Sequence, residues 1–214
     1  LGPLTLAILH QPHAITSMKT TRLTLLSLLF AAFSQAAEPV AVERDGLITI
    51  EAESFVKQTH DEKRRWHVFS ASAMPEINPD GDPPHLEGAS GGAYIELLPD
   101  TRRSHGDKLV NGENFTNKGG EMAVLSYHIK VTNPGRYHVW VRAYSTNSED
   151  NGLHFGLNGE WPESGARWQT VQKDGWNWDC KQRTEKVHTG VTMQLWLDID
   201  KAGDNELLTS PRED

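Results

Sequence analysis

Two glutamates, Glu51 and Glu53, lie close together in the stretch DGLITIEAESF at residues 45–55. The stretch alternates apolar residues such as Ile48 and Ile50 with polar ones, a period of two that predicts a β-strand with one apolar face. On such a strand the two carboxylates share a face about 7 Å apart, since the rise is about 3.3 Å per residue. We expect them to repel each other unless a cation or water lies between them.

Three uses of this glutamate pair are open on the residues alone. The carboxylates can form a solvated face, act as a catalytic pair, or ligate calcium, which takes six to eight oxygen ligands and favours carboxylates. A spacing of about 7 Å does not exclude a catalytic pair. The sequence nevertheless marks no acid–base partner and no nucleophile, so we assign no catalytic residue, and we lean against an enzyme.

Aromatic residues are the second feature with a chemical use. Five of the seven tryptophans fall between residues 140 and 178, and several lie beside polar side chains. Flat rings flanked by amide, guanidinium or carboxylate groups suit sugars, which combine apolar C–H faces with hydroxyls. The candidate ligand-binding residues are Trp140, Tyr144, Trp176, Trp178, Gln182 and Arg183. The alternative is that these rings pack under long insertions and form a second, minor core.

Short alternating runs separated by Gly, Pro and Asn turns account for most of the remaining sequence. The runs are at residues 91–98, 122–131, 136–145, 152–159 and 191–199. Helical patterns are nearly absent, so the sequence predicts an all-β sandwich. Two polar insertions, 59–90 and 99–120, interrupt it, and the aromatic stretch 175–183 is expected to be a loop.

The N-terminal region has the pattern of a secretory signal peptide over residues 18–36. A basic leader precedes the apolar run 23–33, which is too short for a bilayer helix of about 20 residues, and small residues then permit cleavage after Ala36. We expect residues 1–17 to be upstream translation outside the fold. Residues 37–214 then form one domain, secreted, periplasmic or on the cell surface.

Charge and cysteine content narrow the classes of partner. The chain carries 21 basic and 29 acidic residues, a net charge of −8, which argues against nucleic acid or an anionic membrane as partner. Its single cysteine, Cys180, excludes an intrachain disulfide. The domain must therefore be stabilised by its core, or by a core together with a metal ion.

The run ITIEAESF resembles the opening strand of the β-sandwich carbohydrate-binding modules of families 6 and 35. In those families the two glutamates of this motif help to ligate a structural calcium ion, which implies that role for Glu51 and Glu53. Residues 117–165 and the segments after them are similar to modules appended to bacterial polysaccharide-degrading enzymes. One such module is the C-terminal sandwich of family 115 glycoside hydrolases, which act on glucuronic-acid side chains of xylan. Over roughly residues 45–205, the resemblance implies a galactose-binding-like jelly roll without catalytic residues of its own.

The end of the sequence departs from that pattern. Such modules close with a strand that follows an Arg-Glu-Asp triplet, and here the triplet is residues 212–214. We therefore expect the closing strand to be absent, together with the aspartate that completes the calcium shell. The opening strand would then have an unpaired neighbour position and an open backbone edge.

The function expected from these features is that of a secreted, non-catalytic polysaccharide-binding module that carries structural calcium. One alternative is a fragment or accessory domain of a polysaccharide-degrading glycoside hydrolase, with a catalytic glycosidase as partner. Another is a structural adhesion domain of the cell surface. Exposure of the tryptophans discriminates these readings, because a binding module keeps them reachable whereas a structural domain buries them.

Overall fold

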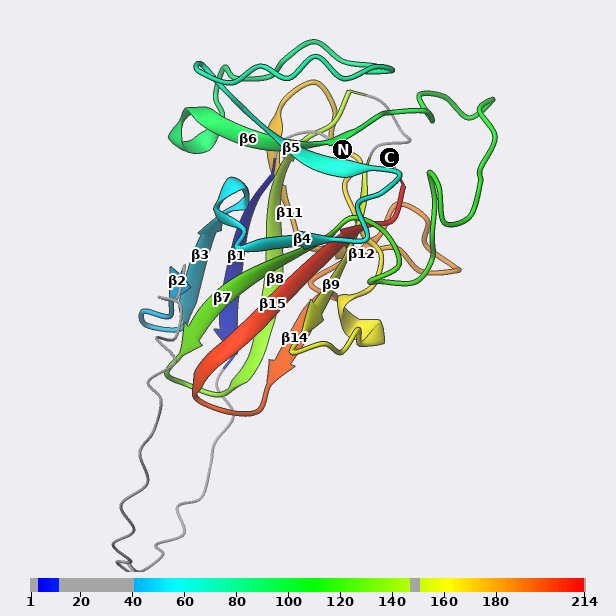
Figure 1. The fold of residues 1–214 in the computed structure, drawn as a ribbon. Helices are drawn as coiled ribbons and strands as arrows, with labels where there is room; N and C mark the ends of the chain where they lie inside the picture. The colour runs from blue at the N-terminus through cyan, green and yellow to red at the C-terminus, as the bar shows by residue number, and fades with distance from the viewer. Residues whose placement is uncertain (1–3, 12–40, 147–150, 214) are drawn as a thin grey trace, which may run out of the picture.

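The computed structural model describes residues 4–11, 41–146 and 151–213. These residues form strands and three short 3-10 helices, η1 (Ala52–Ser54), η2 (Ser90–Gly92) and η3 (Glu163–Gly165). Two larger sheets lie face to face, and a two-stranded sheet crosses one end of them (Figure 1). The predicted all-β sandwich is confirmed. None of the described helices is long and apolar enough to cross a membrane.

Sheet A is the five-stranded layer. Across the sheet its order is β11 (Trp176–Asp179), β8 (Gly135–Tyr144), β1 (Leu4–Gln11) and β3 (Leu47–Glu51), and β14 (Trp196–Ile199) also pairs with β8. The predicted alternation in β8 is confirmed. Tyr137, Val139, Val141 and Ala143 are buried, whereas the residues between them face away from the core.

Sheet B is the eight-stranded layer opposite. Its order is β13 (Val191–Thr192), β12 (Lys181–Gln182), β10 (Trp168–Gln169), β9 (Gly152–Leu157), β15 (Gly203–Pro211), β7 (Val124–Val131) and β2 (Ala41–Val42), and β4 (Lys57–Thr59) also pairs with β7. Leu125, Tyr127, Ile129 and Val131 of β7 are buried as the alternation predicts.

The facing sides of the two sheets form one hydrophobic core. Sheet A contributes Leu6, Ile8, Ile48, Ile50, Val139 and Val141, and sheet B contributes Leu125, Tyr127, Ile129, Phe155, Trp168 and Leu207. Polar atoms of the buried rings have partners. The Tyr127 hydroxyl donates to the Ala52 carbonyl at 2.8 Å, and the Trp168 indole donates to the Asp179 carbonyl at 3.0 Å. Such pairing offsets the cost of burying polar groups.

The third sheet is an antiparallel pair, β5 (Arg65–Ser70) and β6 (Ala93–Leu98). It carries a smaller hydrophobic cluster of Phe69, Tyr94 and Leu98. Strand β5 falls inside the predicted insertion 59–90 and belongs to this separate sheet.

Strand β1 corrects the prediction that residues 1–17 lie outside the fold. Leu4–Gln11 lies between β3 and β8 and pairs with both (Figure 1). Its Leu6 and Ile8 point into the core, since apolar residues recur with a period of two here as in the other strands. The predicted signal peptide at 18–36 lies outside the described residues.

The position beside β3 that was expected to be open is taken by β1. The last described strand, β15, lies in sheet B between β7 and β9 and does not pair with β3. The chain thus places an N-terminal segment where the resemblance implied a C-terminal closing strand.

The apolar run 191–199 is interrupted rather than continuous. Its first residues form β13 in sheet B and its last four form β14 in sheet A. Met193 has a φ of 60° and is 42% exposed. A residue in the left-handed conformation breaks a strand. The apolar residues therefore alternate throughout the sequence of this run, although the chain passes from sheet B to sheet A within it.

We predict that Ile8→Ala lowers the free energy of unfolding by about 2–5 kcal/mol, because it leaves a cavity in the core. Ile8 is fully buried, whereas its neighbour Leu9 is 41% exposed on the other face of β1. The matched Leu9→Ala change should stay within about 0.5 kcal/mol. Urea denaturation of both variants in the full chain is the measurement. Equal effects would mean that β1 does not occupy this place in sheet A.

Candidate functional site

The outward face of sheet A gathers most of the predicted aromatic residues. Antiparallel register sets Trp178 opposite Arg142, Trp176 opposite Tyr144, and Trp196 opposite His138. Directly opposed residues project from the same side of a sheet. Since the alternate residues of β8 are buried, all of these side chains lie on the side away from the core.

Three tryptophans on this side, Trp140, Trp178 and Trp196, make up what we call the aromatic face. Trp178 is 42% exposed, and the other two are half-buried. The Arg136 guanidinium lies 4.5 Å from the Trp196 ring centroid, a cation–π contact, and is held there by paired hydrogen bonds to Asp198 of 2.9 and 3.1 Å. Rings and charged groups thus alternate across a sheet surface.

Trp140 is anchored by its position in the middle of β8. It packs against the main core as well as reaching the outward side. Its indole nitrogen is buried and has no hydrogen-bond partner within the described ranges. A buried donor without an acceptor is unfavourable.

Tyr144 and Trp176 are covered by a loop at residues 85–91. The His85 ring stacks on Tyr144 with centroids 3.7 Å apart. Trp176 packs edge-on against Tyr144, at 6.0 Å, and against Tyr94, at 6.3 Å, and its indole donates to the Glu87 carbonyl at 3.0 Å. Trp176 therefore packs against the smaller hydrophobic cluster, which is the minor-core alternative considered above.

Arg142 holds the same loop against sheet A. Its Nη2 donates to the Gly88 carbonyl at 2.9 Å, and its guanidinium lies 4.8 Å from the Trp176 ring centroid. The loop is thus attached to the sheet beside Trp178, the most accessible ring of the aromatic face.

The two glutamates meet this loop from the other edge of the sheet. Strand β3 ends at Glu51, and the chain turns into η1, so Glu53 is not on the strand face that the alternation predicted. The Ser90 hydroxyl donates to Glu51 Oε1 at 2.7 Å. Glu53 lies close to the next residue of the loop, since a Cβ atom added to Gly91 would be 3.8 Å from Glu53 Oε1. The loop 85–91 therefore brings the carboxylates and the covered aromatic residues into one region.

The surroundings of Glu53 partly fit a cation. Its Oε2 is buried with no hydrogen-bond partner in the described part of the chain. Burial raises the pKa of Glu53, and the nearby charge of Glu51 raises it further. A divalent ion would relieve both effects. Among the described residues there is no group of three or more His, Cys, Asp or Glu that could hold a metal. Carbonyl, hydroxyl or water oxygens would have to complete the shell.

Gln182 and Arg183 lie elsewhere, because the stretch 175–183 is not a loop. It forms β11 in sheet A, passes through buried Cys180, and continues as β12 in sheet B. The Gln182 amide donates to the carbonyls of Glu163 and Ala166, at 2.5 and 3.0 Å. The predicted ligand-binding set therefore divides between two places.

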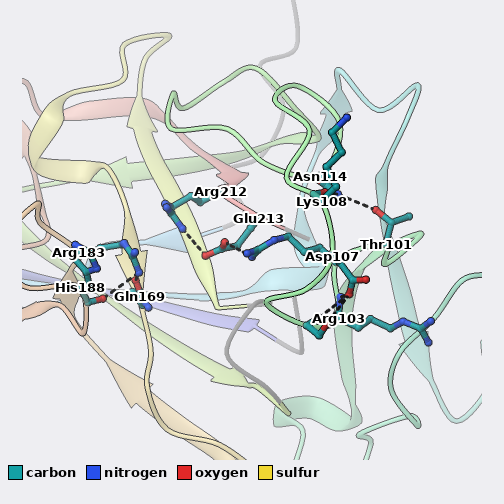
Figure 2. A network of polar contacts seen from close by, with 12 residues as sticks. Thr101, Arg103, Asp107, Lys108, Asn114, Gln169, Arg183, His188, Arg212 and Glu213 are labelled. Carbon is teal, nitrogen blue, oxygen red and sulfur yellow. Dashed lines mark hydrogen bonds and ion pairs between the residues drawn. The ribbon is translucent and has the colours of Figure 1, made fainter.

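Arg183 is one of the residues that line a cavity of ≈ 930 Å³. Its Nη1 donates to Gln169 Oε1 at 3.0 Å and to the His188 carbonyl at 3.3 Å. Figure 2 shows this group at the left of the view and Arg212 with Glu213 in the middle. Sequence reasoning missed Arg212 and also missed His85, the residue that covers Tyr144. Neither residue lies in a periodic pattern that could have marked it.

Comparisons with known proteins give one informative match. The chain is 53% identical over 173 residues to a Formosa agariphila protein described as "Uncharacterized protein P23". The match covers 80% of this chain and 42% of that protein, so the chain spans less than half the length of its relative. No family model matches the sequence, and no solved structure matches it.

We predict that Glu53→Gln changes how stability depends on pH. A carboxyl group whose pKa is raised by folding contributes most below its unfolded value of about 4.5, and that contribution is lost as pH rises through the folded pKa. In the presence of chelator, the variant should therefore gain melting temperature over the native chain as pH rises from about 4 to 8. Glu62→Gln, at an exposed glutamate, is the control. A pH-independent difference for Glu53→Gln would contradict the prediction.

Proposed function

We propose that this chain is a non-catalytic module that binds polysaccharide through the outward side of sheet A. The supporting observation is Trp178, a tryptophan that is 42% exposed on a regular strand, opposite Arg142 in the register. An exposed indole presents a large, flat apolar surface that a partner can cover. A sugar ring offers an apolar face to the indole and hydroxyls to the neighbouring polar groups.

The sheet gives the site the stiffness that such binding needs. Trp178 and Trp196 are on β11 and β14, and both strands pair with β8, the strand that carries Trp140. Adjacent strands lie about 4.8 Å apart. The three rings are therefore held at intervals by backbone hydrogen bonds rather than by loop conformations. A surface of this kind suits an extended glycan chain better than a small, enclosed ligand.

Calcium is the second part of the proposal. Glu51 and Glu53 would hold the ion, and the ion would neutralise two carboxylates that lie close together. Its role would be structural, because the same loop touches Glu51, Arg142 and Trp176. A bound cation at the carboxylates would then stabilise the loop that supports the aromatic residues.

An accessory domain of a polysaccharide-degrading enzyme is a second candidate. The observation that favours it is the length of the relative, of which this chain spans 42%. The two proposals are compatible, because a binding module can be one part of a longer enzyme. Export to the periplasm, cell surface or medium belongs to both. A structural adhesion domain is less well supported, because it would have no use for the exposed ring of Trp178.

We predict that Trp178→Ala and Trp176→Ala have different effects. Trp178→Ala should weaken retention on polysaccharide affinity gels by about tenfold with an unchanged melt, since an exposed aromatic ring contributes to binding rather than to the core. Trp176→Ala should lower stability by about 2 kcal/mol, because a fully buried tryptophan contributes about 3–5 kcal/mol and this one is half-buried. Unchanged retention of Trp178→Ala on every polysaccharide that the native chain binds would remove the basis for the proposal.

We predict that excess calcium raises the melting temperature of the native chain by several degrees relative to chelator. A ligand at about 100 times its dissociation constant adds about 2.7 kcal/mol to the free energy of unfolding. Glu53→Gln should lose most of this response, whereas Glu62→Gln should keep it. If the native melting curve is the same in calcium and in chelator, the pair is not a calcium site.

A further inference from the structure

One cavity of the described residues is unusually basic for this protein. It measures ≈ 930 Å³ and lies beside β12 and β13 of sheet B, away from the aromatic face. Its charged lining comprises the four cationic residues Arg167, Arg183, Lys186 and Arg212, and the two carboxylates Glu163 and Glu185. The chain as a whole has a net charge of −8. Positively charged side chains are therefore concentrated at this cavity, although the chain as a whole is negatively charged.

Arg212 lines the cavity and is itself buried. It is 7% exposed, and its Nη1 donates to Glu213 Oε1. The other oxygen of Glu213 accepts from Arg102 Nη1 at 3.1 Å. One buried carboxylate thus serves two buried guanidinium groups, so this trio carries a net positive charge. Figure 2 shows a dashed line that joins Arg212 to Glu213 in the middle of the view.

One donor of Arg212 has no acceptor. Its Nε is buried and makes no hydrogen bond within the described ranges. Burial lowers the pKa of Arg212, and the charges of Arg183 and Arg102 act in the same direction against the attraction of Glu213. Buried donors are almost always paired in folded proteins. Arg212 therefore has both a donor without an acceptor and an excess of positive charge around it.

Arg183 and Arg167 are held at the cavity by the fold itself. Arg183 N–H donates to the Arg167 carbonyl at 2.8 Å, and Arg167 Nε donates back to the Arg183 carbonyl at 3.1 Å. Both side-chain bonds that the described residues make with Arg183 come from Nη1, so its Nε and Nη2 remain as donors. The arginines are positioned before any ligand arrives, which reduces the entropy lost on binding.

We infer that this cavity binds an oxyanion of a glycan, the carboxylate or sulfate ester of an acidic polysaccharide, with Arg183 and Arg212 as its principal donors. Guanidinium groups match the planar or tetrahedral oxygens of such anions with paired, charge-assisted hydrogen bonds. The inference rests on the proposed function for the polysaccharide part of the ligand. It adds that the module selects acidic chains, in spite of its own negative charge.

The test compares the native chain with Arg183→Gln and with Lys201→Gln, which removes one positive charge from an exposed site between β14 and β15. Affinity gels would contain polygalacturonate, a sulfated galactan or neutral laminarin. We expect Arg183→Gln to lose about tenfold or more in retention on whichever acidic gel retains the native chain, because one charge-assisted contact is removed. Retention on the neutral gel and retention of Lys201→Gln should not change. The two acidic gels distinguish carboxylate from sulfate.

A second measurement does not depend on glycan binding. Sodium sulfate should raise the melting temperature of the native chain and of Lys201→Gln more than that of Arg183→Gln at equal ionic strength. The inference is overturned if Arg183→Gln matches the native chain on the acidic gels, or if only neutral glycan is retained. The proposed function fails separately, when Trp178→Ala matches the native chain on every gel. Sulfate stabilisation that depends on Arg183 would then still support an oxyanion site.

Discussion

The register of β8 is the constraint on which the rest of the structure depends. This one strand pairs with β1 along one edge and with β11 and β14 along the other. Its inward residues complete the core, and its outward residues set the positions of Trp140 and Arg142. A slip of one residue would move every side chain to the opposite face. The hydrophobic core and the aromatic face are therefore specified by a single pattern, and neither can change without the other.

The predictions of buried strand faces that the structure confirms came from the alternation of apolar and polar residues. Burial alternates with a period of two from Tyr127 to Val131 in β7 and from Tyr137 to Tyr144 in β8, which is long enough to identify the buried face from sequence alone. Short strands could not be found this way. The stretch 175–183 read as a loop because four residues serve sheet A and the next strand has only two residues in sheet B. The predicted position of Glu53 on the strand face was wrong for a related reason, because a 3-10 turn ends the alternation after Glu51.

Contacts between segments far apart in the chain account for the remainder. His85 meets Tyr144, and Ser90 meets Glu51, only because the loop 85–91 folds across the end of sheet A. The basic cavity likewise joins Arg167 and Arg183 to Arg212, a residue near the end of the described chain. The sequence around each residue does not indicate which distant residue it will contact. Its composition does indicate which residue types are available, and the tryptophans were noticed for that reason.

Cys180 has a consequence that follows from its place at the crossing between the sheets. It is the single thiol of the chain, it lies between β11 and β12, and its sulfur contacts the Leu195 carbonyl at 3.5 Å. Burial raises the pKa of this thiol to about 11, so it is protonated and shielded from reagents in the folded state. Alkylation requires the two sheets to separate locally. The rate at which a thiol reagent labels the native chain therefore reports local opening of the sandwich. No cysteine has to be introduced, and no second cysteine contributes to the signal.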